Sequence, residues 1–237
     1  HPRSSAASDV YKRQFLHCSG YLNNDTNFAN YFGKMYQPRY LSGLAAGAMT
    51  DSNKIGYVAA FPIPEVIRGI NAFAAGVNEV NPEATVEVVW TFTWFGPEAE
   101  TQAANALLEK GADVLAQHQD STATGLAAEA AGAKWISYNT AYGQDSAPEA
   151  FVTAPVWDWG PYYVNIVEQI IDGTFTTESY WGGMETGLVS LYDLSSDVPS
   201  DIATLIAEKT EAIIDGTLEV EIVEEEFISN VIGTVNP

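Results

Sequence analysis

The sequence predicts an α/β protein of the doubly wound class, in which helices cover both faces of a parallel sheet. Short apolar, β-branched runs alternate with helical segments from Lys54 to Gly173, and this alternation is typical of parallel strands. Of the 237 residues, 46% are hydrophobic and 17% are charged. Such a balance indicates a folded chain with a large buried core and not a disordered one.

The segment before Lys54 is less regular. Phe15 to Ser19 is a short apolar run typical of a strand end, and Leu22 to Asn30 is predicted to be an asparagine-rich loop. Tyr31 to Met49 has the apolar spacing of a helix, in which Gly43 and Gly47 allow another element to pack closely. Four polar residues that follow, Thr50 to Asn53, are predicted to link two lobes.

Five strands and four helices are predicted from the regular part. The expected strands are Lys54 to Ala60, Thr85 to Thr91, Ala112 to Gln117, Lys134 to Tyr138 and Ala150 to Ala154. The expected helices are Glu65 to Val80, Pro97 to Lys110, a segment from Asp120 or Ser121 to Ala131, and a segment from Asp158 to about Asp172. Prolines open the first two helices, and aspartate or serine side chains are expected to cap the other two.

Composition excludes several classes of function. The 31 Asp and Glu residues against 10 Lys and Arg give a formal net charge of -21, which disfavours binding to nucleic acids or anionic membranes. Cys18 is the single cysteine, so neither an internal disulfide nor a paired-thiol metal site can form. No apolar run reaches the roughly 18 residues of a membrane span. Residues 1–14 differ in character from the rest and are expected to be a non-native leader.

Aromatic and polar residues gather in the loops that follow the predicted strands. Because the carboxyl ends of parallel strands meet at one edge, ligands of this class bind there. Aromatic faces can stack on a planar ring, and amides and carboxylates can bond to its edge. The predicted ligand-binding residues are Phe61, Trp94, Phe95, His118, Gln119, Asp120, Asn139, Trp157, Asp158 and Trp159.

Each of these residues also has a purely structural interpretation. The tryptophans could pack between the lobes, and a loop histidine such as His118 more often forms an internal hydrogen bond than a ligand contact. Asp120 and Asp158 could serve only as helix caps. Asn139 has no helix directly behind it, which favours contact with a ligand.

Motifs for catalysis and for cofactors are scarce. The sequence contains no G-x-G-x-x-G, no phosphate-binding G-x-x-x-x-G-K-[ST] and no G-x-S-x-G, and its histidines lack the spacing of metal ligands. His118 and Asp120 could form an acid and base pair, but no nucleophile accompanies them. We therefore expect a binding protein with no catalytic residue, no metal and no cofactor.

Several segments in combination resemble one family. They are YFGKMYQPRYLSGLAAGAM, KIGYVAAFPIPEVIRGINAFAAGVNEVNP, TFTWFGPEAETQAANALLEKGADVLAQHQDSTAT and APVWDWGPYYV. From Phe15 to Asp215 the chain resembles the basic membrane protein family, the purine-nucleoside-receptor-like substrate-binding proteins of ABC importers. The resemblance implies a type I periplasmic-binding fold, whose two lobes close on a ligand by hinge motion. It implies a location in the periplasm or at the outer face of the cell membrane.

The resemblance also implies a site and a domain organisation. Phe61, Trp94, Asn139 and the loop from Trp157 to Trp159 match loops that line the family's cleft. The expected division is a remnant of lobe 1 at 15–52, lobe 2 at 53–190, and a C-terminal return segment with a helix at 191–237. Most of lobe 1 and the lipid-attachment cysteine of family members are expected to be missing, so membrane attachment would require a lipid anchor outside this sequence.

The expected function is that of an extracytoplasmic solute-binding protein, which passes a purine base or nucleoside to an ABC permease. Family members that bind nucleosides carry Asp-Ser-Asp where this chain has Tyr138, Asn139 and Thr140, and they carry a Lys-Arg pair near Trp157. Their absence favours a neutral base, and relatives with a tryptophan-rich site bind adenine. Two alternatives stay open: the effector domain of a transcription regulator, and a nucleoside-processing enzyme that uses His118 and Asp120.

Overall fold

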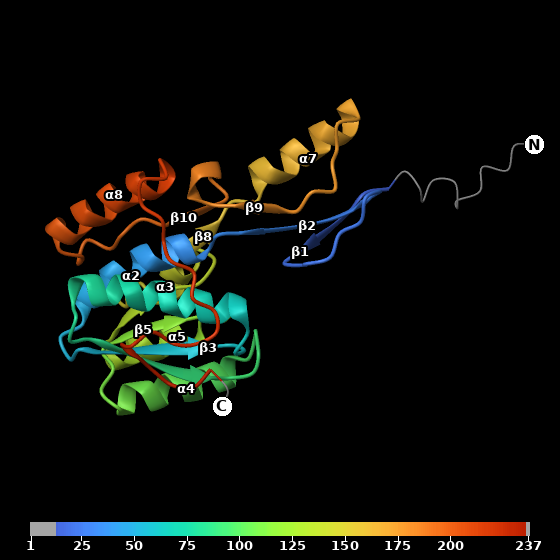
Figure 1. The fold of residues 1–237 in the computed structure, drawn as a ribbon. Coiled ribbons are helices and arrows are strands. Elements are labelled where there is room, and N and C mark those ends of the chain that lie inside the picture. The colour runs from blue at the N-terminus through green and yellow to red at the C-terminus, as the bar shows by residue number, and fades with distance from the viewer. Residues whose placement is uncertain (1–12, 236–237) are drawn as a thin grey trace, which may run out of the picture.

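A computed structural model describes residues 13–235 of the chain and shows two lobes joined by a few connecting segments (Figure 1). Residues 1–12 of the expected leader lie outside the described residues. The lower lobe in this view contains a large parallel sheet, and the upper lobe contains a smaller sheet and the helices α7 (Gly160–Asp172) and α8 (Ser200–Ile214).

The large sheet has six parallel strands in the order β11-β4-β3-β5-β6-β7. Its strands are β3 (Lys54–Ala59), β4 (Thr85–Trp90), β5 (Val114–Gln117), β6 (Lys134–Ile136), β7 (Phe151–Thr153) and β11 (Val231–Ile232). Five of them fall within the predicted runs, shortened at their ends. The edge strand β11 was not predicted, because its apolar run is only two residues long.

Helices cover both faces of this sheet, which confirms the predicted fold class. On one face α2 (Tyr36–Met49) and α3 (Pro64–Val80) pack in one core, and on the other α4 (Pro97–Glu109) and α5 (Ala123–Ala131) pack in a second. The predicted close approach at Gly43 is present, because an added Cβ would lie 2.0 Å from the carbonyl oxygen of Phe73 in α3. A further helix, α8 (Ser200–Ile214), packs against α2 on the side away from the sheet.

The small sheet consists of β1 (Phe15–Cys18), β2 (Phe28–Gly33) and β9 (Tyr180–Gly182), all parallel. The helix α7 (Gly160–Asp172) packs on it, with the ring of Tyr162 stacked 4.7 Å from that of Tyr31 in β2. The hydroxyls of Tyr31 and Tyr163 lie 2.8 Å apart. The expected division at residue 190 assigns α7 and β9 to lobe 2, but their packing places both beside the N-terminal strands.

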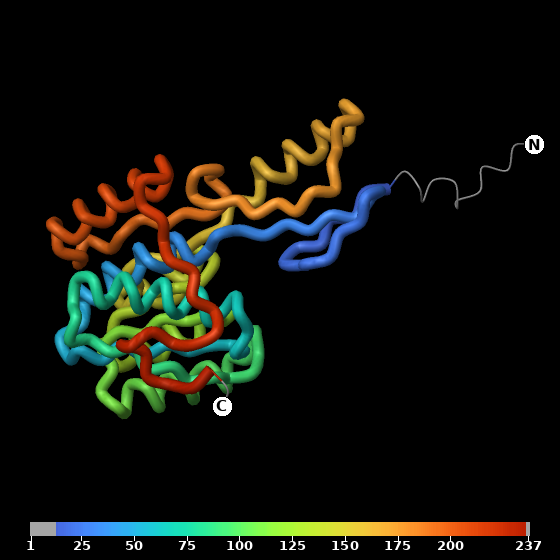
Figure 2. Tube along the Cα trace, in the orientation of Figure 1, coloured from blue at the N-terminus to red at the C-terminus, as the bar shows by residue number. Residues whose placement is uncertain are grey.

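Two antiparallel strands, β8 (Pro155–Trp157) and β10 (Val189–Leu191), connect the two lobes. The chain after α8 then runs down past α3 and ends beside β4 as β11, which Figure 2 shows as the red trace. Short helical turns lie at α6 (Gly143–Ser146) and η1 (Met184–Thr186). Within residues 13–235, no helix has the length and apolar character needed to cross a lipid bilayer.

The first predicted helix starts later than expected. Residues 28–33 pair with β1 and β9 as a strand, so α2 begins at Tyr36 and not at Tyr31. The expected loop over 22–30 is shortened for the same reason. Alternating aromatic and small residues in this stretch are compatible with either structure, and pairing with β9, about 150 residues away, decides between them.

Candidate ligand-binding site

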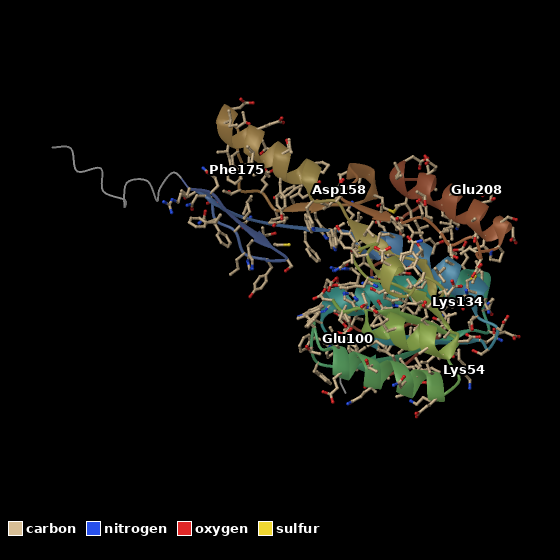
Figure 3. All side chains as sticks on the ribbon, turned by 180° about the vertical axis from the view of Figure 1, so that it is seen from behind. Lys54, Glu100, Lys134, Asp158, Phe175 and Glu208 are labelled. Carbon is tan, nitrogen blue, oxygen red and sulfur yellow. The ribbon has the colours of Figure 1, made fainter. Side chains whose placement is uncertain are left out.

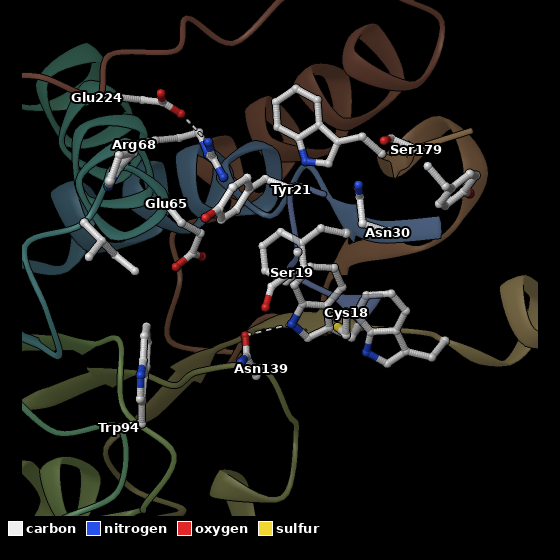
Figure 4. Close-up of a pocket in the computed structure, with 18 of the residues that line it drawn as sticks. Cys18, Ser19, Tyr21, Asn30, Glu65, Arg68, Trp94, Asn139, Ser179 and Glu224 are labelled. Carbon is white, nitrogen blue, oxygen red and sulfur yellow. Dashed lines mark hydrogen bonds and ion pairs between the residues drawn. The ribbon is translucent and has the colours of Figure 1, made fainter. Parts of the chain in front are cut away.

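A cavity of about 1040 Å³ lies between the carboxyl edge of the large sheet and the small sheet. One side is formed by the loops after β4 and β6 and by the first turn of α3. The other side is formed by β1, β2, β9 and the end of β8. Figure 4 shows side chains from both sides facing this hollow. The cavity is therefore built from segments far apart in the sequence.

Trp94 lines the cavity from the large-sheet side. It lies in the loop after β4, where its ring packs 5.6 Å from Phe61 and 6.1 Å from His118. The backbone N–H of Asp120 donates to the carbonyl of Trp94 at 2.8 Å. The buried carboxylate of Glu100 accepts bonds from the Gly96 N–H at 2.9 Å and from the Ser121 hydroxyl at 2.6 Å. These contacts fix the loop, while the Trp94 side chain stays partly exposed to the cavity.

Three further tryptophans, Trp157, Trp159 and Trp181, line the small-sheet side. The rings of Trp157 and Trp159 stack 4.5 Å apart at an angle of 15°. Phe32 of β2 packs 5.1 Å from Trp157, and Tyr31 meets Trp159 edge to face at 5.3 Å. Because each ring is supported by another, this aromatic wall is expected to be rigid.

Asn139 lies between these two sides. Its backbone has a φ of 60°, in the left-handed region that asparagine tolerates better than most residues. Its side-chain oxygen accepts a hydrogen bond from the Trp157 indole N–H at 3.0 Å (Figure 4). Since the oxygen is used in this way, the amide NH₂ is the group that can donate to a bound molecule.

A network of polar groups runs through the core and ends at the cavity in Glu65, in the first turn of α3. Glu65 Oε1 lies 3.3 Å from His118 Nε2, and His118 Nδ1 lies 3.5 Å from the Tyr57 hydroxyl. The Tyr57 oxygen accepts a bond from Arg39 Nη1 at 2.6 Å. With a neutral imidazole, Tyr57 donates to His118 and His118 donates to Glu65, so the groups are mutually satisfied.

Burial and neighbouring charges set the protonation states of His118 and Glu65 in this network. Burial lowers the pKa of His118 to about 4, and the Arg39 guanidinium adds to the shift, although Glu65 opposes it. At neutral pH the imidazole is therefore uncharged. Burial raises the pKa of Glu65, but its electrostatic interaction and hydrogen bond with His118, followed by the positive charges of Arg39 and Arg68, outweigh it, so the net shift is downward. Glu65 thus faces the cavity as a carboxylate.

Arg68, one turn further along α3, joins three segments at the rim. It forms an ion pair with Glu224 of the C-terminal tail. Its guanidinium carbon also lies 5.4 Å from the centre of the Trp181 ring on β9 and 6.0 Å from that of Tyr36. This cluster ties α3, the tail and the small sheet together on one side of the hollow (Figure 4).

The predicted site residues fall into two groups. Those that line the cavity are Trp94, Asn139, Trp157 and Trp159. Those that do not line it are Phe61, Phe95, His118, Gln119, Asp120 and Asp158. Trp94 and Asn139 lie at the carboxyl edge of the large sheet, as the strand-end argument predicts, whereas Trp157 and Trp159 line the opposite, small-sheet side of the hollow.

Most residues of the second group make contacts with other parts of the protein. Phe61 and His118 support Trp94 from behind, and Gln119 is buried with its amide bonded to the Thr91 hydroxyl. Phe95 is 66% exposed and does not line the cavity. Because His118 is completely buried, it cannot pair with Asp120 as an acid and base on a substrate.

Neither Asp120 nor Asp158 caps its helix with its side chain, contrary to expectation. Asp158 accepts a bond from the Gly160 N–H at 3.0 Å and lies at the start of α7 (Figure 3). This is a local turn contact and not the expected helix cap, because the N-cap residue of α7 is Trp159 and no side chain caps that end. At α5 the Ser121 hydroxyl, and not Asp120, accepts from the Ala123 N–H, at 3.2 Å. Burial, together with nearby Glu100, raises the pKa of Asp120.

The sequence did not single out several residues that line the cavity. Glu65 and Arg68 were treated as ordinary helix positions, although Glu65 follows a strand end just as the predicted loop residues do. Phe32 and Trp181 lie on β2 and β9, and nothing local in the sequence signals that these strands pair. Among residues 13–235, no cluster of three or more His, Cys, Asp or Glu side chains is arranged to hold a metal ion.

Comparison with known proteins identifies relatives over most of the chain. Residues 3–223 match the Bmp family model, described as ABC transporter substrate-binding protein PnrA-like. An ABC transporter glucose-binding protein of Haloferax volcanii is 42% identical over 92% of this chain and 56% of its own length. A purine-binding protein of Brucella abortus is 39% identical over 84% of this chain and 56% of its own. The chain thus spans about half the length of these relatives.

Solved structures share the fold at low sequence identity. A solute-binding protein of an ABC transporter system from Conexibacter woesei has a TM-score of 0.71 at 24% identity, over 88% of this chain and 71% of that one. A solute-binding protein from Aeropyrum pernix has a TM-score of 0.77 at 15% identity, over 90% and 71%. A transcriptional activator of the comK gene from Bacillus halodurans reaches 0.79 at 20% identity, over 88% and 72%. The likeness confirms the periplasmic-binding type of fold and shows the fold alone.

Proposed function

The chain belongs to the Bmp family of PnrA-like ABC transporter substrate-binding proteins, and from this premise we propose that its cavity binds a purine base or nucleoside. The whole protein would pass this ligand to an ABC permease. Substrate-binding proteins of ABC importers work outside the cytoplasm, so we place the whole protein in the periplasm or at the outer face of the membrane, held there by a lipid anchor.

One observation carries the purine proposal: tryptophans from both sides of the hollow line the same cavity. Trp94 comes from the large-sheet side, and the stacked Trp157 and Trp159 come from the other. A flat ring between them can stack on an aromatic face, which contributes about 1 to 3 kcal/mol per base in nucleic-acid complexes. Asn139 and Glu65 supply polar groups at the edge of such a ring.

Glucose is the second candidate, because the Haloferax volcanii relative is named for it and is about as similar as the purine-binding one. A sugar can also pack on tryptophan. Its hydroxyls, however, point outward around the whole ring, and each needs a polar partner when it is buried. Broad aromatic surfaces on both sides favour the purine.

Calorimetric titration of the chain with adenine, guanine, their nucleosides and glucose tests the proposal. We expect saturable binding of a purine that Trp94→Ala weakens about tenfold or more, as the loss of one stacking face implies. The matched control is Phe95→Ala, in the same loop but outside the cavity, which should leave the affinity unchanged. No binding of any purine, or saturable binding of glucose alone, would overturn the proposal.

A further inference from the structure

The carboxylate of Glu65 is placed to interact with a ligand directly. It lines the cavity from the first turn of α3, and its side chain is 23% exposed. Figure 4 shows the carboxylate pointing into the hollow, on the same side as Trp94 and toward Asn139. One oxygen, Oε1, is held by His118, so the other oxygen is the acceptor that can meet a bound molecule.

The groups behind Glu65 fix both its position and its charge. His118 is completely buried and Arg39 is 2% exposed, so neither can move into the cavity. Among the described residues, Arg39 forms no ion pair with a carboxylate, and its Nε and Nη2 atoms have no hydrogen-bond partner. The positive charge buried behind the site therefore favours a negative charge on Glu65. This geometry agrees with the downward shift of the pKa of Glu65.

An ionised carboxylate only accepts hydrogen bonds, whereas the NH₂ group of Asn139 only donates. A ligand edge that satisfies both presents an N–H donor next to an acceptor. A purine with an exocyclic amino group beside an unprotonated ring nitrogen has such an edge. A purine whose edge carries no donor leaves the carboxylate desolvated and unpaired, which weakens binding strongly.

We propose that Glu65 is the specificity-determining residue of the cavity and selects purines that carry an amino group. This assignment rests on the proposed function and names the kind of purine that the site prefers. Glu65 takes part in no reaction; it binds the ligand by accepting a hydrogen bond from the amino group of the purine. Asn139 contacts the neighbouring ring nitrogen.

9-Methyladenine and 6,9-dimethylpurine form the decisive pair of probes, because the methyl group at N9 removes the ring N–H that a free purine base could offer to Glu65 in place of an amino group. The two molecules have nearly the same size and shape, but a methyl group replaces the amino donor in the second. We expect the unmodified chain to bind 9-methyladenine at least about tenfold more tightly than 6,9-dimethylpurine, as a hydrogen bond to a charged acceptor implies. In Glu65→Gln, which keeps the side-chain volume but removes the charge, the ratio should fall to within about threefold.

The control is Glu109→Gln, an exposed glutamate at the end of α4, which should keep the ratio of the unmodified chain. Thermal unfolding of each variant shows whether it folds, and the ratio in the unmodified chain tests the assignment without any variant. Equal affinities for the two probes, or a preference that survives in folded Glu65→Gln, would overturn the assignment alone. If neither probe binds, the assignment is overturned, and the proposed function falls with it only if no other purine in the calorimetric series binds.

Discussion

Acid should destabilise the protein through His118 before its carboxylates titrate. The imidazole is completely buried, and its pKa falls from 6.5 to about 4 because of burial and the nearby Arg39. As the pH falls, the unfolded chain binds a proton at His118 first, so the stability present above the unfolded pKa is lost. The difference between the two pKa values is worth about 3 kcal/mol once both titrations are complete, and about 2 kcal/mol of it is lost by pH 5.

Urea unfolding followed by circular dichroism at pH 7.5 and pH 5 measures this loss. In His118→Gln, which cannot be protonated, the unfolding free energy should change about 2 kcal/mol less between the two conditions, whatever its absolute stability. His17→Gln, at an exposed position, is the matched control and should behave like the unmodified chain. Equal pH dependence in His118→Gln and the unmodified chain would refute the assignment of a buried neutral imidazole.

Three other changes probe the packing and the site. Gly43→Ala should destabilise the fold by about 1 to 3 kcal/mol in urea unfolding, because its Cβ would overlap the Phe73 carbonyl, and wild-type stability would contradict the tight contact. Glu100→Gln should lower purine affinity several-fold by loosening the Trp94 loop, measured by calorimetry; unchanged affinity would show that the loop does not need this carboxylate. Asn139→Ala should weaken purine binding about fivefold or more through loss of its amide donor, and equal affinity would exclude that contact.

The large sheet was predictable because its signals are local. Each strand from β3 to β7 is a short apolar run, and prolines at the starts of α3 and α4 mark the helix boundaries. In the small sheet only β1 was predicted, from the apolar run Phe15 to Ser19; β2 was not, because it is defined by pairing with β9 far along the chain. Long-range pairing leaves no periodic signal in a six-residue strand.

The same distinction explains the site. Trp94 and Asn139 follow strands of the large sheet, so the rule that ligands bind at carboxyl edges located them. The rule could not separate residues that line the cavity from those that support it: His118 follows β5 in the same way but points into the core. Nor could it identify Phe32 or Trp181, which reach the cavity only because the two sheets face each other.

A crystal structure of the chain soaked with adenine tests the central claim most directly. We predict a planar ring in van der Waals contact with Trp94 on one side and with Trp157 or Trp159 on the other, its amino group toward Glu65. Adenine bound away from this hollow, or touching none of these tryptophans, would contradict the claim.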